Sequence, residues 1–475
     1  MRNCVCDRKI LQQLILLAIA LLLLLFCLFA RSSAAETLDR EGLFRDGYTD
    51  PYIDDILQSR SFSNLIVSIQ ADESILYDET DGLISGSHPA SGMDGEHEIR
   101  LFVYDENGRT LIVQDVGIRV SGADARKAAR KSYRIIAREE YDKQAPDFTY
   151  DLWGGRTTVN GSEQEITGYS SFTLHAVRLD ADATGIHNSV GYSLAKKAGV
   201  IDASPTTPAA LYINGSYQGA YFILPSKTDN ALAELYNIEE KDDIEVASIF
   251  DEEKTGSQAY PEVVAEYLEL VEYILSSDLS DPEVQSVVES QLDVEQFLQY
   301  YAVNLLLGNG DWIDNNLRVW RCQDNDLPYQ DGKWRVYLFD LDWIGTYPEM
   351  IEYDFWLAIR DTSNYNILPK LLENPDWRDR FIEIIYEMEE SAFNEETIEA
   401  VFAEETARIE DEISYDYQSD AFGTYMTYSV ESEAVPEEEW LTLDDWEDKV
   451  ENFKSRLLRA PGIINQCIEM AWPEE

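Results

Sequence analysis

Positively charged residues are scarce in this 475-residue sequence, which has 37 Lys and Arg against 91 Asp and Glu and a formal net charge of -54. A surface this acidic repels nucleic acid and anionic lipid, which argues against both as partners. It is typical of an acidic exterior suited to salt or to secretion. Internal repeats and Pro- or Ser-rich linkers are also missing, which predicts one continuous domain after the N-terminal leader.

Cysteine is rare outside the leader. Of the five Cys, only Cys322 and Cys467 lie beyond residue 35. They could form a disulfide if the protein is exported to an oxidising compartment, or remain as two buried thiols.

Residues 1–35 predict a signal peptide or an uncleaved signal anchor. Arg2, Arg8 and Lys9 precede an apolar run over residues 14–30, and small residues follow at 32–35. The length of the run lies between that of a cleaved signal and that of a membrane span. We expect export to the extracellular space or the cell surface, with residues 10–30 as a membrane anchor if the leader is retained.

The remaining chain is globular in composition, with 45% hydrophobic and 12% aromatic residues. Alternating apolar residues predict strands over residues 65–69, 98–104, 110–113, 133–137 and 172–178, and on both sides of the turn at Asn214 and Gly215. Helices are expected over 187–198, over 294–306 up to Gly308, and from 369 onward. This pattern predicts an α+β fold, with a β-rich lead-in over residues 36–115 and the main domain over residues 116–475.

Two polar stretches, residues 310–316 and 337–342, predict a divalent-metal site. The strand-like run at 317–321, the turn-rich segment around Leu327 and Pro328 and the strand-like run at 333–339 predict a hairpin that places Asn316 roughly opposite Asp340. Asp340 and Asp342 would then share one face of a strand. Carboxylates beside a carboxamide suit Mg²⁺ or Mn²⁺. The alternative is that both Asp residues only end the strand.

A basic patch stands out in this acidic chain, with five cations in nine positions: Arg126, Lys127, Arg130, Lys131 and Arg134. Phosphate binding and ordinary solvated surface both explain such a patch.

The order of these segments resembles the spore coat protein H (CotH) kinase family, an atypical protein-kinase-like group. Residues 76–86 resemble its lead-in, residues 116–135 its RGNSSR…KKSYR segment, and residues 214–221 its NGxYxGxY segment. Residues 311–316 resemble its W/N-rich loop, and residues 340–345 its DLDxxxG segment. The match extends from about residue 76 into the C-terminal helices.

The resemblance implies an atypical protein-kinase-like fold and ATP-dependent phosphorylation of Ser/Thr on surface or spore-coat proteins. By the matching positions, Lys131 would neutralise ATP phosphates, and Asp340, Asp342 and Asn316 would hold the metal. Asp314, Asp340 or Asp342 would accept the proton of the substrate hydroxyl. The resemblance further suggests three aromatic residues that could stack on adenine and two phosphate-contacting arginines, with core packing and salt bridges as the alternatives: Tyr221, Trp343, Trp356, Arg126 and Arg178.

The chain departs from the family pattern near the glycine segment, where Ser121 and Ala123 replace Arg and Asn, and at Pro225, where Glu is usual. His187 and Asn188 also stand where many members have Arg and Asp. These departures favour a second hypothesis, a catalytically inactive surface scaffold or adhesion protein. A third and weaker hypothesis, a carbohydrate-surface protein, rests on the ten Trp.

Overall fold

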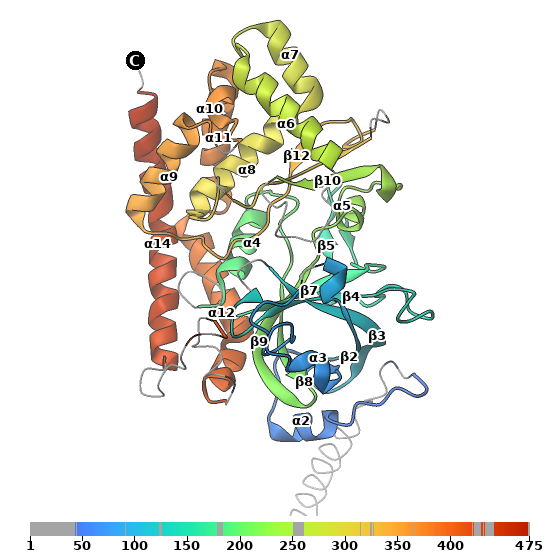
Figure 1. Ribbon diagram of the computed structural model, residues 1–475. Helices are drawn as coiled ribbons and strands as arrows, with labels where there is room; N and C mark the ends of the chain where they lie inside the picture. Colours follow the sequence, from blue (N-terminus) through green and yellow to red (C-terminus); the bar gives the residue numbers. More distant parts are fainter. Residues whose placement is uncertain are drawn as a thin grey trace, which may run out of the picture.

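The computed structural model describes residue 43 and residues 45–473, apart from a set of internal gaps. These gaps are residues 91, 123–125, 178–183, 250–260, 314, 324, 326, 364, 420, 422–428, 431 and 433–440. The chain forms a β-barrel at one end and a helical half at the other, with the long helix α14 (Leu443–Ala471) along one side (Figure 1).

The barrel is closed, in the strand order β1-β2-β3-β4-β7-β9-β8. Neighbouring strands pair antiparallel except β1 and β8, which pair parallel and close the barrel. Alternate residues such as Val67, Leu101, Ile135 and Leu174 point into its apolar core. The strands are β1 (Leu65–Gln70), β2 (His97–Tyr104), β3 (Thr110–Ser121), β4 (Ser132–Ile136), β7 (Ser171–Ala176), β8 (Thr207–Ile213) and β9 (Ser216–Pro225).

The helical half packs around a second apolar core and a small sheet in the order β10-β11-β12. Its sheet comprises β10 (Ile244–Ser248), β11 (Arg318–Cys322) and β12 (Arg335–Val336). Its helices include α6 (Pro261–Ser276), α7 (Pro282–Gln291), α8 (Val294–Leu307), α9 (Pro348–Arg360), α10 (Leu368–Leu371), α11 (Pro375–Ser391) and α12 (Glu395–Tyr417).

Shorter elements connect or cover these two halves. Among them, α4 (His187–Lys197) leads from the barrel towards the helical half (Figure 1). The others are α2 (Ile53–Ser59), α3 (Glu73–Leu76), η1 (Gly92–Gly95), β5 (Arg156–Thr157), β6 (Glu163–Gln164), α5 (Asp229–Leu235) and η3 (Lys241–Asp243).

Buried ion pairs join the barrel to helix α12. Arg130 Nη1 lies 2.6 Å from Asp416 Oδ2, and both side chains are almost fully buried. Gly219 on β9 makes room for this pair, because a Cβ added there would overlap the Arg130 guanidinium. Arg60, which follows α2, similarly meets Glu412 at 2.7 Å. Arg130 and Arg60 therefore hold α12 against the barrel, although positively charged residues are scarce in this chain.

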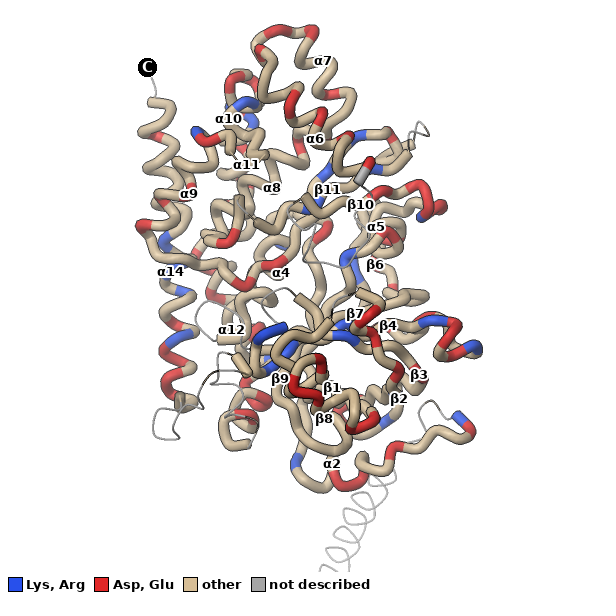
Figure 2. The backbone as a smooth tube through the Cα atoms, in the orientation of Figure 1, with Lys and Arg blue, Asp and Glu red and all other residues tan. Residues whose placement is uncertain are grey.

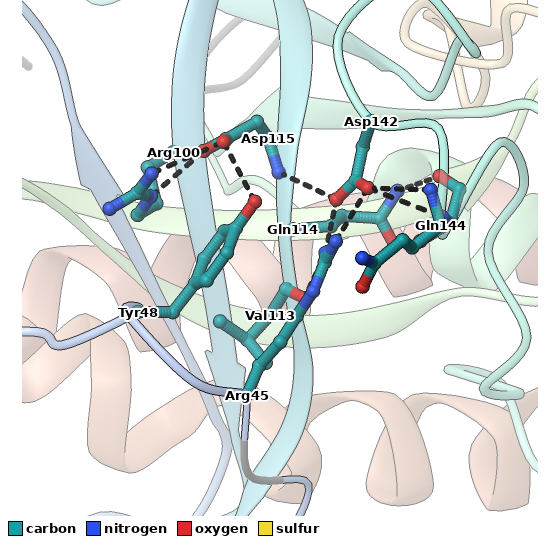
Figure 3. A network of polar contacts seen from close by, with 9 residues as sticks. Arg45, Tyr48, Arg100, Val113, Gln114, Asp115, Asp142 and Gln144 are labelled. Carbon is teal, nitrogen blue, oxygen red and sulfur yellow. Dashed lines mark hydrogen bonds and ion pairs between the residues drawn. The ribbon is translucent and has the colours of Figure 1, made fainter.

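The segment before α2 is fixed to the outside of the barrel by a polar network (Figure 3). Arg45 pairs with Asp142, and the Tyr48 hydroxyl donates to Asp115 over 2.8 Å. The Tyr48 ring lies between the guanidiniums of Arg45 and Arg100, at 4.4 and 4.1 Å from its centroid. The lead-in expected over residues 36–115 thus supplies part of the barrel, and β3 runs across its expected end at residue 115.

The strands and helices expected from the sequence are largely confirmed. The turn at Asn214 and Gly215 joins β8 to β9, and Gly308 ends α8 in the left-handed conformation with φ 57°. Cys322 and Cys467 are both buried free thiols, so the alternative of a disulfide between them is wrong. Within the described residues, no helix is both long and apolar enough to cross a membrane. The expected leader and anchor, residues 1–35, lie outside the described part.

Candidate functional site

The candidate site centres on a loop, residues 338–342, that carries Asp340 and Asp342; we call it the carboxylate loop. The hairpin before it is confirmed, because β11 and β12 pair antiparallel with Val319 opposite Val336. Continued outward, this register puts Asn316 level with Phe339, one residue from the expected position. The second strand, however, ends at Val336.

The expectation that Asp340 and Asp342 share one face of a strand is therefore wrong. Asp340 has φ 59°, a left-handed conformation that no regular strand contains. The loop is shaped instead by side chains from other segments. The Leu341 amide donates to Asn188 Oδ1 over 2.9 Å, and the Asp342 carbonyl oxygen lies 3.0 Å from His187 Nδ1. The first turn of α4 thus determines the path of the loop.

The Asp342 carboxylate contacts His175 on the barrel and Asn188 on α4. Its Oδ1 is 3.1 Å from His175 Nε2 and also accepts a short hydrogen bond from Asn188 Nδ2. His175 is on β7, on the opposite face from Leu174 and Ala176, which point into the barrel core. The outer face of the barrel therefore meets the carboxylate loop here.

A third acidic residue, Asp311, is near enough to Asp340 to act on it electrostatically. Its carboxylate accepts hydrogen bonds from the side-chain amides of Asn315, at 3.2 Å, and of Asn316, at 3.0 Å. The structure thus keeps Asn316, expected as a metal ligand, beside Asp311. Asp314, one of the expected proton acceptors, lies outside the described residues.

Burial and neighbouring negative charge act together on Asp340. Burial, followed by repulsion from Asp342 and then, more weakly, from Asp311, raises the pKa of Asp340 to about 7, although His175 and Arg318 oppose the shift. Asp340 and Asp342, which lie close enough to repel each other, offer the oxygen donors that a hard divalent cation prefers, whereas the Asn316 amide donates to Asp311.

Among the residues that the structure describes, His, Cys, Asp and Glu side chains alone do not complete a metal site here. Across the described part of the chain, no group of three or more His, Cys, Asp or Glu side chains is arranged to hold a metal ion. A cation bound by Asp340 and Asp342 would draw its other ligands from amide oxygen, water and phosphate, which is usual for Mg²⁺.

An arginine of the helical half, Arg318, links these carboxylates to arginines of the barrel, because it interacts electrostatically with both Asp340 and Arg134. Arg119 and Arg134 are paired neighbours on β3 and β4 and point away from the barrel core. Burial and repulsion from Arg119 and Arg318 lower the pKa of Arg134 to about 10. Arg318, at the start of β11, stacks over Phe339 at 4.6 Å. Figure 2 shows basic positions beside β4 and β7, in a backbone that is otherwise rich in acidic residues.

Lys131, expected to neutralise ATP phosphates, is 1% exposed. Its ammonium donates to the carbonyl oxygens of Arg126 and Ala128, each at 3.0 Å. Tyr221, expected to stack on adenine, is also 1% exposed and donates its hydroxyl to the Lys131 carbonyl over 2.9 Å. The Tyr221 ring packs against Tyr133 in the barrel core, which corresponds to the core-packing alternative.

The other expected contacts are dispersed. Arg126 donates to the Gly122 carbonyl over 3.0 Å at the end of β3. Trp343 follows the carboxylate loop directly and is 50% exposed. Trp356 lies on α9 with the Arg360 guanidinium 3.8 Å from its ring centroid. Arg178 lies outside the described residues. Of the expected aromatic contacts, only Trp343 adjoins the carboxylates in sequence and is open to a ligand.

The residues of this candidate site lie within a match to a known protein family. The sequence profile of the CotH kinase protein family matches residues 118–455, from β3 into α14. The chain belongs to the CotH kinase protein family. A search of curated proteins finds no match. The family match includes the carboxylate loop, Asp311 and both sets of arginines, whereas β1 and β2 precede it.

The sequence alone did not reveal the residues that hold the carboxylate loop in place. In the sequence, His187 and Asn188 stand out only as departures from the family pattern, yet they contact the loop directly. His175 and Arg318 gave no signal of their own, because each is a single polar residue within a strand-like run. The departure at His187 and Asn188 was the one signal that could have located this contact.

Proposed function

We propose that this protein is a CotH-type atypical kinase that transfers the γ-phosphate of ATP to Ser or Thr hydroxyls of surface or spore-coat proteins. One observation carries the proposal: Asp342 in the carboxylate loop contacts His175 on the outer face of the barrel, and Arg318 interacts electrostatically with both Asp340 and the barrel residue Arg134. Carboxylates that suit a divalent cation and guanidiniums that suit phosphate come together between two halves. We also propose that these halves correspond to the two lobes of a kinase-like fold.

The proposed roles follow from the contacts. Asp340, Asp342 and Asn316 would hold Mg²⁺ or Mn²⁺, which when bound offsets the negative charge of the ATP phosphates. Arg134 and Arg318 would contact the phosphates from opposite sides of the interface. Phosphoryl transfer depends mainly on such positioning and charge neutralisation.

Asp311 is the best-placed acceptor for the proton of the substrate hydroxyl. Two amide donors, from Asn315 and Asn316, orient its carboxylate. Asp342, by contrast, is already engaged by His175 and Asn188. Asp340 has its pKa raised to about 7 and belongs to the proposed metal pair. A carboxylate that is oriented but not committed to the cation suits general-base work.

Phosphate transfer from labelled ATP to protein acceptors, with Mn²⁺ or Mg²⁺, tests the proposal. The wild-type protein should transfer phosphate, Asp340→Ala should not, and Asp311→Asn should retain nucleotide binding while transfer falls strongly. Glu399→Gln, an exposed change on α12, serves as the matched control and should behave as wild type. Transfer by wild type no greater than that by Asp340→Ala would refute the kinase activity.

A catalytically inactive scaffold is the second candidate function. It is favoured by Pro225, which ends β9 where the family pattern has Glu, and by the engagement of the Lys131 ammonium with loop carbonyls. Calorimetry with ATP and Mn²⁺ separates the two functions. Metal-dependent nucleotide binding together with transfer supports the kinase, whereas absence of both supports the scaffold. Under either function we propose export, with surface or coat proteins as partners.

A further inference from the structure

A lysine and an aspartate outside the proposed ligand set meet at Leu338, the first residue of the carboxylate loop. The Leu338 amide donates to Asp202 Oδ2 over 2.7 Å, and its carbonyl oxygen accepts from Lys227 Nζ over 2.6 Å. Asp202 lies in the turn after α4, and Lys227 follows β9. Two side chains therefore satisfy the backbone groups that the end of β12 leaves without a strand partner.

The surroundings of this contact bury Asp202 and hold both side chains in place. Asp202 is 3% exposed, and its Oδ1 has no hydrogen-bond partner. Lys227 Nζ lies 4.4 Å from the ring centroid of Tyr337 and 5.1 Å from that of Tyr192, and it also donates to the Asp202 carbonyl over 3.3 Å. Burying polar and charged groups costs free energy unless hydrogen bonds and opposite charges replace their lost hydration.

The contacts to Leu338 matter for the site because Leu338 lies close to Asp340 in the chain. Leu338 is two residues before Asp340, whose left-handed backbone cannot be fixed by sheet pairing. On the other side of Asp340, Asn188 and His187 hold Leu341 and Asp342. The loop is thus fixed at both ends, by Asp202 and Lys227 before Asp340 and by α4 after it.

We propose that Asp202 and Lys227 are positioning residues that fix the Leu338 backbone and so set the Asp340 carboxylate in its cation-binding place. This inference rests on the proposed metal site, in which neither residue is a ligand. Partners behind a metal ligand typically change metal affinity by about 10- to 100-fold when they are removed. Both residues lie outside the polar segments that pointed to the site, so their role is visible only in three dimensions.

A matched control exists at Val336, two residues before Leu338. Gln296 holds Val336 in the same manner, donating from Nε2 to its carbonyl over 2.7 Å and accepting from its amide over 2.8 Å. Gln296→Ala removes an equivalent pair of backbone contacts from the strand itself. It should destabilise the protein without moving Asp340.

Two measurements on the full chain test the proposal: Mn²⁺ affinity by calorimetry and amide hydrogen exchange over residues 338–342. Asp202→Ala and Lys227→Met should weaken Mn²⁺ binding by at least about tenfold and speed exchange in this segment. Asp202→Asn, which keeps an oxygen for the Leu338 amide, should fall between wild type and Asp202→Ala and guards against a variant that fails to fold. Gln296→Ala should leave both readouts as in wild type.

Unchanged exchange in Asp202→Ala would overturn the proposal, as would a loss of Mn²⁺ affinity in Gln296→Ala equal to that in Asp202→Ala. If wild type binds no Mn²⁺, the proposed metal function fails, and the exchange comparison still decides whether Asp202 and Lys227 fix the loop. The two failures are therefore distinguishable.

Discussion

Replacing Asp340 by Asn should make the metal-free protein more stable while abolishing its metal binding. Burial and the adjacent carboxylates raise the pKa of Asp340 from 3.8 to about 7. An acid whose pKa is raised by folding destabilises the folded state when it is ionised. The Asn side chain keeps the shape and removes the charge, so the variant avoids this penalty.

The pH dependence has a definite sign and size. Well below the ordinary pKa of 3.8 the carboxyl is protonated in both folded and unfolded chains, so no penalty exists. The penalty grows as pH rises towards 7 and is constant above that value. A pKa difference of this size corresponds to about 4 kcal/mol, which partial contact of the side chain with water reduces to about 2 kcal/mol.

Thermal unfolding in the presence of a chelator, at pH values from 4 to 8, measures this effect. Asp340→Asn should unfold a few degrees higher than wild type at pH 8 and at nearly the same temperature near pH 4. Saturating Mn²⁺ should reverse the order, because only wild type gains binding energy. A stability difference that does not change with pH would refute the electrostatic reasoning, and Glu399→Gln should show no difference at any pH.

Three further results are expected from other parts of the molecule. Asp416→Ala should lower the free energy of unfolding by about 3–5 kcal/mol, because it leaves the Arg130 charge buried and unpaired. In denaturant titrations, Arg130→Met combined with Asp416→Met should cost less stability than the sum of the two single Met changes. Cys322 and Cys467 are buried with pKa values raised to about 11, so mass spectrometry should find neither thiol alkylated in the folded protein at pH 8. Arg318→Met should weaken ATP binding by about tenfold or more by calorimetry, and unchanged affinity would remove this guanidinium from the proposed phosphate site.

Local sequence patterns predicted most of the individual elements. The Asn214 and Gly215 turn and the apolar alternation around it correctly gave β8 and β9. The closure of the barrel was not predictable in the same way, because it depends on the parallel pairing of β1 with β8, about 140 residues apart. Alternation indicates which face of a strand is buried but not which distant strand is its neighbour.

The candidate site shows the same division. The hairpin that precedes the carboxylates followed from turn residues and strand patterns, and its register was correct to within one residue. The conformation of the loop was not, because a left-handed Asp340 depends on contacts from α4 and from Lys227 that no local pattern contains. Asp202 and Lys227 lie 136 and 111 residues from Leu338 in sequence.

The change at Pro225 alters how the phosphate charge would be neutralised. In protein kinases a lysine is oriented towards the phosphates by a glutamate. Here Pro225 pairs with Phe172 at the end of β9 and has no carboxylate, and the Lys131 ammonium donates to the carbonyls of Arg126 and Ala128. Arg134 instead lies on the outer face of the barrel, electrostatically coupled to Arg318. Because guanidiniums bind phosphate with two parallel donors and remain charged when partly buried, we expect these arginines, rather than Lys131, to neutralise the phosphate charge under the proposed kinase function.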